Sequence, residues 1–135
     1  MATRSTITVR GPNANASFYR HWDGYPAWTG RHLCHVLRDA HTLEAVAVAL
    51  LTAHRESPHG GDRYELTVMP DTHDDREWHY DVRVMRTGAH IRVYHRPIGG
   101  SMSVAFDGDL PACRRWCAGQ LRDLLGRHRD RQRVA

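Results

Sequence analysis

The stretch WHYDVRVMRTGAHIRVYH, residues 78–95, decides the fold of this chain. Apolar residues recur in it at every second position on both sides of the turn RTGA: Trp78, Tyr80, Val82 and Val84, then Ile91 and Val93. Such alternation is typical of strands that bury one face and expose the other. Because Tyr64, Leu66 and Val68 alternate in the same way before the turn PDTHDD, the sequence predicts a three-stranded meander.

The segments after the meander predict one more strand and a long helix. Met102–Phe106 has the composition of a strand, which the turn pair Asp107-Gly108 should end. Asp109 and Pro111 suit the start of a helix. The apolar stripe of this helix comprises Cys113, Trp116, Cys117, Leu121, Leu124 and Leu125. Residues 126–135 are rich in Arg, and we expect this tail to fray.

The segments before the meander predict a hairpin and two helices. Thr3–Arg10 and Ala16–Trp22 flank the turn GPNANA, so they should pair antiparallel. An amphipathic helix over residues 28–39 follows, with Leu33, Val36, Leu37 and Ala40 on one face. Thr42 can cap a second helix, which SPHGGD closes and whose apolar face holds Leu43, Val46, Ala47 and Leu50.

Together these elements predict an α+β fold in one domain, residues 1–135. Their order is two strands, two helices, four strands and a helix. The hairpins favour a mostly antiparallel sheet with the helices packed on one face.

Composition and charge restrict the protein class. A hydrophobic share of 41% with 25% charged residues is ordinary for a globular protein, and no apolar run reaches membrane-spanning length. The first residues contain no apolar core of a signal peptide, and three cysteines is an odd number that favours reduced thiols. We therefore expect a soluble, cytoplasmic protein.

The strand TRSTI, residues 3–7, and the motif YRHWDGYP, residues 19–26, stand before a helix with Gly30 and Leu33. In these features, over roughly the first 40 of the 135 residues, the chain resembles an uncharacterised family of small proteins encoded by bacteriophages and prophages. The resemblance implies a mobile-element origin and no activity. The chain departs from it at Arg20, where the relatives often have Cys, so no thiol role carries over to this position.

The motif HWDGYP, residues 21–26, is the main candidate for a ligand site. In an extended segment His21 and Asp23 would point to the same side and could hydrogen-bond beside the aromatic face of Trp22. Such a site would suit a base or a sugar, with a nearby guanidinium on the phosphate. Its residues would be Arg20, His21, Trp22, Asp23, Tyr25 and Arg31. The alternative is structural: Trp22 anchors the core and Asp23-Gly24 makes a turn.

Metal sites receive less support from the sequence. His32 and His35 are spaced to share an ion, but Cys34 is rotated away from both on the helix, and no closed four-ligand pattern occurs. The acidic loop with Asp71, His73, Asp74 and Asp75 matches no calcium-loop spacing. We therefore predict no metal and no cofactor.

Nucleic acid is a second candidate ligand. All 19 basic residues are Arg, and Arg115, Arg122 and Arg129 repeat every seven residues on the face opposite the apolar stripe of the last helix. That face could grip phosphates. The alternative is that it is the solvated side of an amphipathic helix, and a net charge of +4 is modest for a DNA-binding protein.

No enzyme class emerges, because Ser101 and Ser103 lack a nucleophile elbow and the paired glycines lack phosphate-loop spacing. We expect a phage- or mobile-element-encoded accessory binding protein, in particular a counter-defence factor that inhibits a host protein or sequesters a nucleotide signal. A nucleic-acid-binding protein is the first alternative, and a metal-dependent hydrolase is the last. A homo-oligomer interface would be marked by an exposed Trp28, Trp78 or Trp116.

Overall fold

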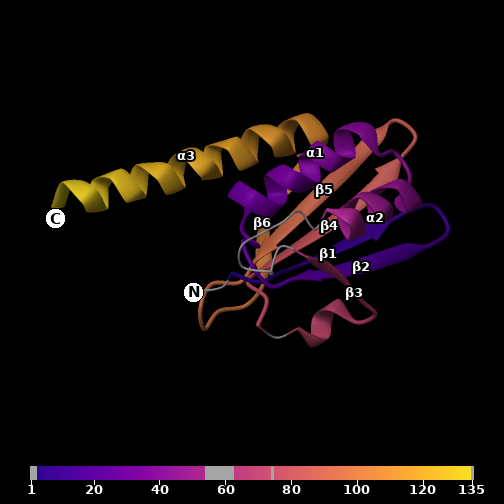
Figure 1. Cartoon of the computed structure of the whole chain (residues 1–135), viewed down its shortest axis with the longest axis horizontal. Coiled ribbons are helices and arrows are strands. Elements are labelled where there is room, and N and C mark those ends of the chain that lie inside the picture. Colours follow the sequence, from indigo (N-terminus) through magenta and orange to yellow (C-terminus); the bar gives the residue numbers. More distant parts are fainter. Residues whose placement is uncertain (1–2, 54–62, 74, 135) are drawn as a thin grey trace.

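The computed structural model of the chain describes residues 3–53, 63–73 and 75–134. They form one six-stranded sheet in the order β3-β2-β1-β4-β5-β6, with helices packed against it (Figure 1). The strands are β1 (Ser5–Arg10), β2 (Asn15–Arg20), β3 (Tyr64–Thr67), β4 (Trp78–Met85), β5 (Gly88–His95) and β6 (Ser103–Asp109). The helices are α1 (Arg31–Asp39), α2 (Leu43–Thr52) and α3 (Leu110–Val134), with short helical turns η1 (Pro26–Gly30) and η2 (Pro70–Thr72). The predicted α+β fold is confirmed.

One face of the sheet is apolar and carries the helices. Its fully buried strand residues include Ile7, Val9, Phe18, Tyr80, Val82, Ile91 and Val93. The helices meet them with Leu33, Leu37, Val46, Leu50, Cys113 and Cys117. Each fully buried aliphatic side chain contributes about 1.5–3 kcal/mol relative to exposure, so this layer provides most of the driving force for folding.

The central pair of strands joins the two halves of the sheet. β1 and β4 run parallel, with Ser5 opposite Trp78 and Arg10 opposite Arg83, whereas the other neighbouring strands pair antiparallel. A parallel pair needs a long crossover between its strands. Here the crossover contains β2, α1, α2 and β3, which brings the N-terminal hairpin beside the strands of the deciding stretch.

The predicted meander is wrong in its first member. β3 pairs with β2 at the edge of the sheet and is separated from β4 by two strands, so the consecutive strands that pair are β4, β5 and β6. Val68 lies beyond the end of β3 and is 96% exposed. Alternation identifies a half-buried strand, but it says nothing of which strand lies beside it.

Two predicted boundaries also move. β6 continues through Asp107-Gly108 to Asp109, whose side chain then accepts a hydrogen bond of 3.0 Å from the amide of Ala112 at the start of α3. The helix predicted over 28–39 begins instead as the wide turn η1 and becomes regular at Arg31. The predicted closure of the second helix at SPHGGD lies outside the described residues.

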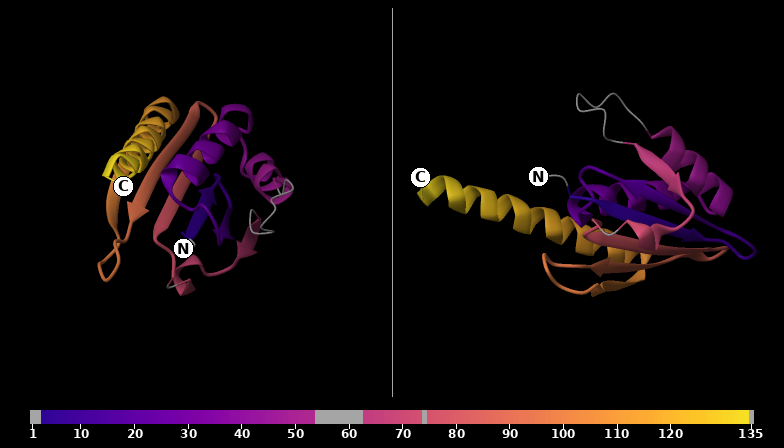
Figure 2. Two further views of the ribbon diagram at one scale, coloured as in Figure 1. Left: turned by 60° about the vertical axis from the view of Figure 1, so that its left-hand side comes forward. Right: turned by 90° about the horizontal axis from the view of Figure 1, so that it is seen from below.

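Helix α3 runs from the sheet into open space. Its first half packs on β5, β6 and α1, and its second half projects beyond the sheet (Figure 2). We predict fraying from Gly126, whereas the structure continues the helix to Val134. Arg and Gln are good helix formers, so the single glycine at position 126 does not end it. No helix in the described part of the chain is long and apolar enough to cross a membrane.

Candidate functional site

Arg20 lies inside the protein. Its side chain is buried, and Nη1 donates hydrogen bonds to Thr29 Oγ1 at 3.1 Å and to the Tyr64 hydroxyl at 2.7 Å. The guanidinium carbon stands 4.8 Å from the centre of the Tyr64 ring, a cation–π contact. Arg20 therefore ties β2 to η1 and β3.

His21 and Asp23 are not joined by a hydrogen bond in the part of the chain that the structure describes. Strand β2 ends at Arg20 and Asp23 has a left-handed φ of 53°, so the alternation that would align the two side chains stops before them. Instead, His21 Nδ1 accepts a hydrogen bond of 3.3 Å from Arg4, and the His21 ring meets the Trp22 ring edge-on. Trp22 remains 38% exposed.

The second half of the HWDGYP motif, residues 24–26, has a structural role. The Gly24 amide donates to the carbonyl of Thr3, and the Gly24 carbonyl accepts a 2.7 Å hydrogen bond from the buried Tyr80 hydroxyl. A Cβ at Gly24 would stand 2.7 Å from the Thr3 oxygen, so glycine is required there. Tyr25 accepts a hydrogen bond from Trp28, which is 43% exposed. HWDGYP thus forms a corner that holds the sheet to η1.

The face of the sheet away from the helices is polar. Cross-strand neighbours there form rows, one of which contains Thr8, Asp81, Arg92 and Asp107, and the next Asn15, Arg10, Arg83 and His90. The Arg10 guanidinium grips Asp81 through Nε at 3.0 Å and Nη2 at 3.1 Å. Hydrogen bonding to Asp81 and the charge of Asp81 raise the pKa of Arg10.

The loop before β4 covers one end of this polar face. Arg76 donates a 3.1 Å hydrogen bond to Thr6 Oγ1, which also lies 2.7 Å from His79 Nδ1. The His73 ring stacks on Tyr19 at 4.2 Å. Burial, and then the positive charge of Arg76, lower the pKa of His79 to about 4. His79 is therefore a neutral structural residue at pH 7.

A hollow of about 910 Å³ opens at the other end of the sheet. We call it the arginine hollow, and it is lined by residues 10–15, 41–44 and 83–86. A second hollow of about 420 Å³ adjoins it on the polar face and shares Arg10, Arg83 and Met85. The five residue steps of β1 separate this end from HWDGYP by roughly 16 Å at 3.3 Å per residue.

Positive groups converge on the arginine hollow. Arg10, Arg83 and Arg86 line it, and the first two are register partners on the central strands. Helix α2 begins at its wall, capped by Thr42, whose hydroxyl accepts from the Ala45 amide at 3.1 Å. Like charges on facing strands repel each other, and the N-terminus of a helix is positive. Glu44 also lines the hollow and Asp81 pairs with Arg10, so the excess positive charge comes mainly from Arg83 and Arg86, and an anion would offset it.

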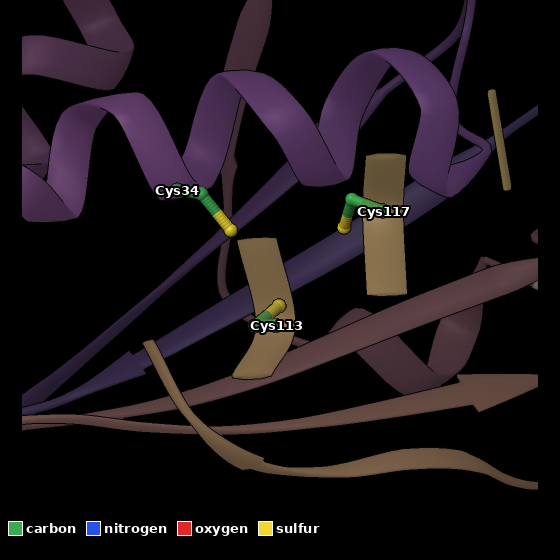
Figure 3. A group of neighbouring side chains, drawn as sticks. All are labelled: Cys34, Cys113 and Cys117. Carbon is green, nitrogen blue, oxygen red and sulfur yellow. The ribbon is translucent and has the colours of Figure 1, made fainter. Parts of the chain in front are cut away.

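The three cysteines gather between α1 and α3, on the side of the sheet that the helices cover (Figure 3). Cys34 comes from α1, whereas Cys113 and Cys117 lie one turn apart on α3, and all three are at most 3% exposed. Hydrogen bonds from Cys113 and Cys117 lower the pKa of Cys34 against the effect of burial. Hydrogen bonds with Cys117 and Cys34, together with burial, raise the pKa of Cys113.

The remaining predicted residues lie apart from one another. Arg31 is exposed at the start of α1, and Arg115, Arg122 and Arg129 are exposed along α3. In the acidic loop, Asp71 pairs with Arg76 and Asp75 with Arg4, each at 2.9 Å, while Asp74 lies outside the described residues. His32 Nδ1 lies 2.8 Å from the Tyr64 hydroxyl. The predicted site residues therefore do not form one cluster: Arg31, Arg115, Arg122 and Arg129 are exposed, and the acidic side chains of the loop are paired with arginines.

No protein-family model, curated protein or solved structure matches this chain. Its own geometry therefore indicates where it can act. The arginine hollow was not predicted from the sequence, because its residues come from two hairpin turns and a helix start that only the fold brings together. The pairing of Cys113 with Cys117 is visible as a helical repeat, but the approach of Cys34 is not.

Proposed function

We propose that this chain is a binding protein whose ligand is an anion of nucleotide size, held in the arginine hollow. The observation that carries the proposal is the convergence of Arg10, Arg83 and Arg86 on one concave surface. A volume of about 910 Å³ falls within the range of small-molecule sites. The ligand class agrees with the nucleotide expected from the sequence, but the site lies at the other end of the sheet.

The lining suits both parts of a nucleotide. Arg forks bind phosphate through paired hydrogen bonds, and Asp81 holds the Arg10 fork through Nε and Nη2, leaving Nη1 outside the ion pair. Apolar groups of Pro12, Leu43 and Met85 line the same hollow and offer a surface for a base. Free inorganic phosphate would use only the arginines and should bind more weakly.

Native mass spectrometry of the purified chain tests this proposal. The probes are ATP, cyclic AMP, inorganic phosphate and a small-molecule cell extract. Arg83→Glu reverses a charge in the hollow, and Arg122→Glu makes the same change on the exposed surface of α3. Charge-assisted hydrogen bonds contribute about 1.5–3 kcal/mol each, so Arg83→Glu should weaken nucleotide binding at least about tenfold. Arg122→Glu should leave it unchanged.

The variant Trp22→Ala distinguishes a ligand site in the arginine hollow from a ligand site at the HWDGYP corner. Trp22 is partly exposed, so its loss should keep the fold, which thermal unfolding would verify. Nucleotide binding that survives Arg83→Glu and is lost in a folded Trp22→Ala variant would move the site to the corner. If the mass of the ligand-free chain alone is observed with every probe, the nucleotide proposal is wrong and protein partners become the next candidates.

The cellular role that we propose is counter-defence. Sequestration of a nucleotide signal requires only binding, and the likeness of TRSTI and HWDGYP to phage and prophage proteins supports a mobile-element setting. Capture of a host defence protein is the other form of this role. A plasmid that expresses the chain should protect a phage from a nucleotide-signalling defence system, and Arg83→Glu should remove the protection.

A second candidate function is nucleic-acid binding by α3. The observation that favours it is the projection of the helix beyond the sheet, with Arg122, Arg127 and Arg129 exposed (Figure 2). Phosphate contacts release counterions, so affinity for a DNA duplex should fall steeply with salt. Arg122→Glu should weaken this binding, whereas Arg83→Glu should not. The same pair of variants therefore distinguishes the two functions.

A further inference from the structure

The cysteine cluster has the composition of a metal site. The Sγ atoms of Cys34, Cys113 and Cys117 all lie within 4.8 Å of one another, and none of the three cysteines is in a disulfide. Two helices supply them, which fixes their Cα positions through the packing of α1 on α3. Figure 3 shows the three side chains converging between the helices.

We propose that this cluster binds one Cu(I) ion through three thiolates. Sulfur ligands are soft, and they select soft ions such as Cu(I) and Zn²⁺ over hard ones. Structural Zn²⁺ takes four ligands in a tetrahedron. Among the described residues, no imidazole or carboxylate joins the three sulfurs, and their burial restricts water as a fourth ligand. A closed three-coordinate site suits Cu(I) better.

The spacing needs only a small adjustment. An ion about 2.3 Å from each of three sulfurs holds them roughly 3.8–4.0 Å apart. The sulfurs already lie within 4.8 Å of one another, so rotation about Cα–Cβ bonds suffices to close the site. Gly30 stands on one side, where a Cβ would come within 2.8 Å of Cys117 Sγ. Glycine at this position therefore keeps space beside the sulfur.

Nearby positive charges offset part of the charge of the thiolates. Arg114 favours ionised Cys34 and Arg31 favours ionised Cys117, but hydrogen bonds among the three thiols and burial have larger effects, and on balance they raise the pKa of Cys117. Three thiolates with Cu(I) carry two net negative charges, which are costly to bury without such partners.

The test uses the full chain, reduced with a phosphine and handled without oxygen. Cu(I) is added as its acetonitrile complex and competed with bathocuproine disulfonate, and native mass spectrometry counts the ions bound. We expect one ion per chain, lost in Cys34→Ser, Cys113→Ser and Cys117→Ser. His35→Asn is the matched control, because it removes an exposed metal-binding ring from the same helix as Cys34 and should retain the ion.

X-ray absorption of the copper-loaded wild-type chain keeps the proposal testable if a serine variant fails to fold. Three sulfur ligands at roughly 2.3 Å would support it. Nitrogen or oxygen ligands, or binding that survives the cysteine variants, would show adventitious binding to the histidines and overturn it. Zn²⁺ held more tightly than Cu(I) by the same cysteines would overturn the assignment of the ion.

Discussion

The two faces of the sheet are made by alternate residues of the same strands, yet they have opposite chemistry. The face under the helices holds Tyr80 and Val82, and the helices that cover it carry the three thiols, all with almost no exposure. The face away from the helices, the open face, carries the ion pairs Arg10–Asp81 and Arg92–Asp107, all partly exposed to solvent. The comparison teaches that the covered face supplies stability and the open face is available for a ligand. Four predictions test this comparison and the structural roles assigned above.

The largest loss of stability should come from removing a tyrosine ring on the covered face of the sheet. Removing a tyrosine ring on the open face should cost much less. Tyr80→Ala removes a fully buried ring and its 2.7 Å hydrogen bond to Gly24, so we expect a loss of about 3–5 kcal/mol in the free energy of unfolding. Tyr94→Ala, on the neighbouring strand but on the open face, should cost about 1 kcal/mol or less. Urea denaturation measures both. Equal losses would contradict the division of the two faces.

His79 lies where the loop before β4 covers the polar face of the sheet, and it should make the stability of the protein depend on pH. The pKa of His79 falls from 6.5 in the unfolded chain to about 4 in the folded one, so the unfolded chain binds the proton more readily. His79 therefore contributes about 3 kcal/mol at most to the free energy of unfolding, and this contribution is present above pH 6.5 and lost as pH falls towards 4.

Denaturation at pH 7.5 and at pH 4.5 measures this change, and His79→Gln should reduce the difference between the two values. His35→Asn, which changes an exposed ring, should not. A wild-type chain and a His79→Gln variant that lose equal stability on acidification would show that His79 is not protected.

Two glycine substitutions test the HWDGYP corner against the projecting helix. Gly24→Ala places a Cβ 2.7 Å from the Thr3 carbonyl oxygen, and we expect a loss of about 1–3 kcal/mol. Gly126→Ala meets nothing within 4 Å and should strengthen the helix by up to about 1 kcal/mol. Thermal unfolding and circular dichroism distinguish the two. If Gly24→Ala is neutral, the corner is not the structural anchor described above.

The smallest effect on stability is expected at the ion pair beside the arginine hollow. Asp81→Asn removes the carboxylate that grips Arg10, and since both side chains are partly exposed the cost should be about 0.5–1 kcal/mol. The same change frees the Arg10 fork and should tighten nucleotide binding. Calorimetry with ATP measures the affinity. Weaker binding in a folded Asp81→Asn variant would mean that Asp81 positions Arg10 rather than competing for it.

Sequence patterns were sufficient where the physical cause is local. Alternation in residues 78–95 predicted β4 and β5 because each strand buries one face, and Thr42 predicted the start of α2 because its hydroxyl caps a backbone amide. Alternation did not identify the partner of β3, since both edges of a sheet accept a strand. It also did not show that Arg20 turns inward to Tyr64.

The sequence by itself determined the α+β class, the helical stripe containing Cys113 and Cys117, and the two faces of each strand, because these follow from periods of a few residues. Only the tertiary structure decided that Arg10 and Arg83 lie side by side and that Cys34 joins the other thiols. The physical reason is distance along the chain. Such contacts depend on how the crossover between β1 and β4 packs, and no local pattern encodes that packing.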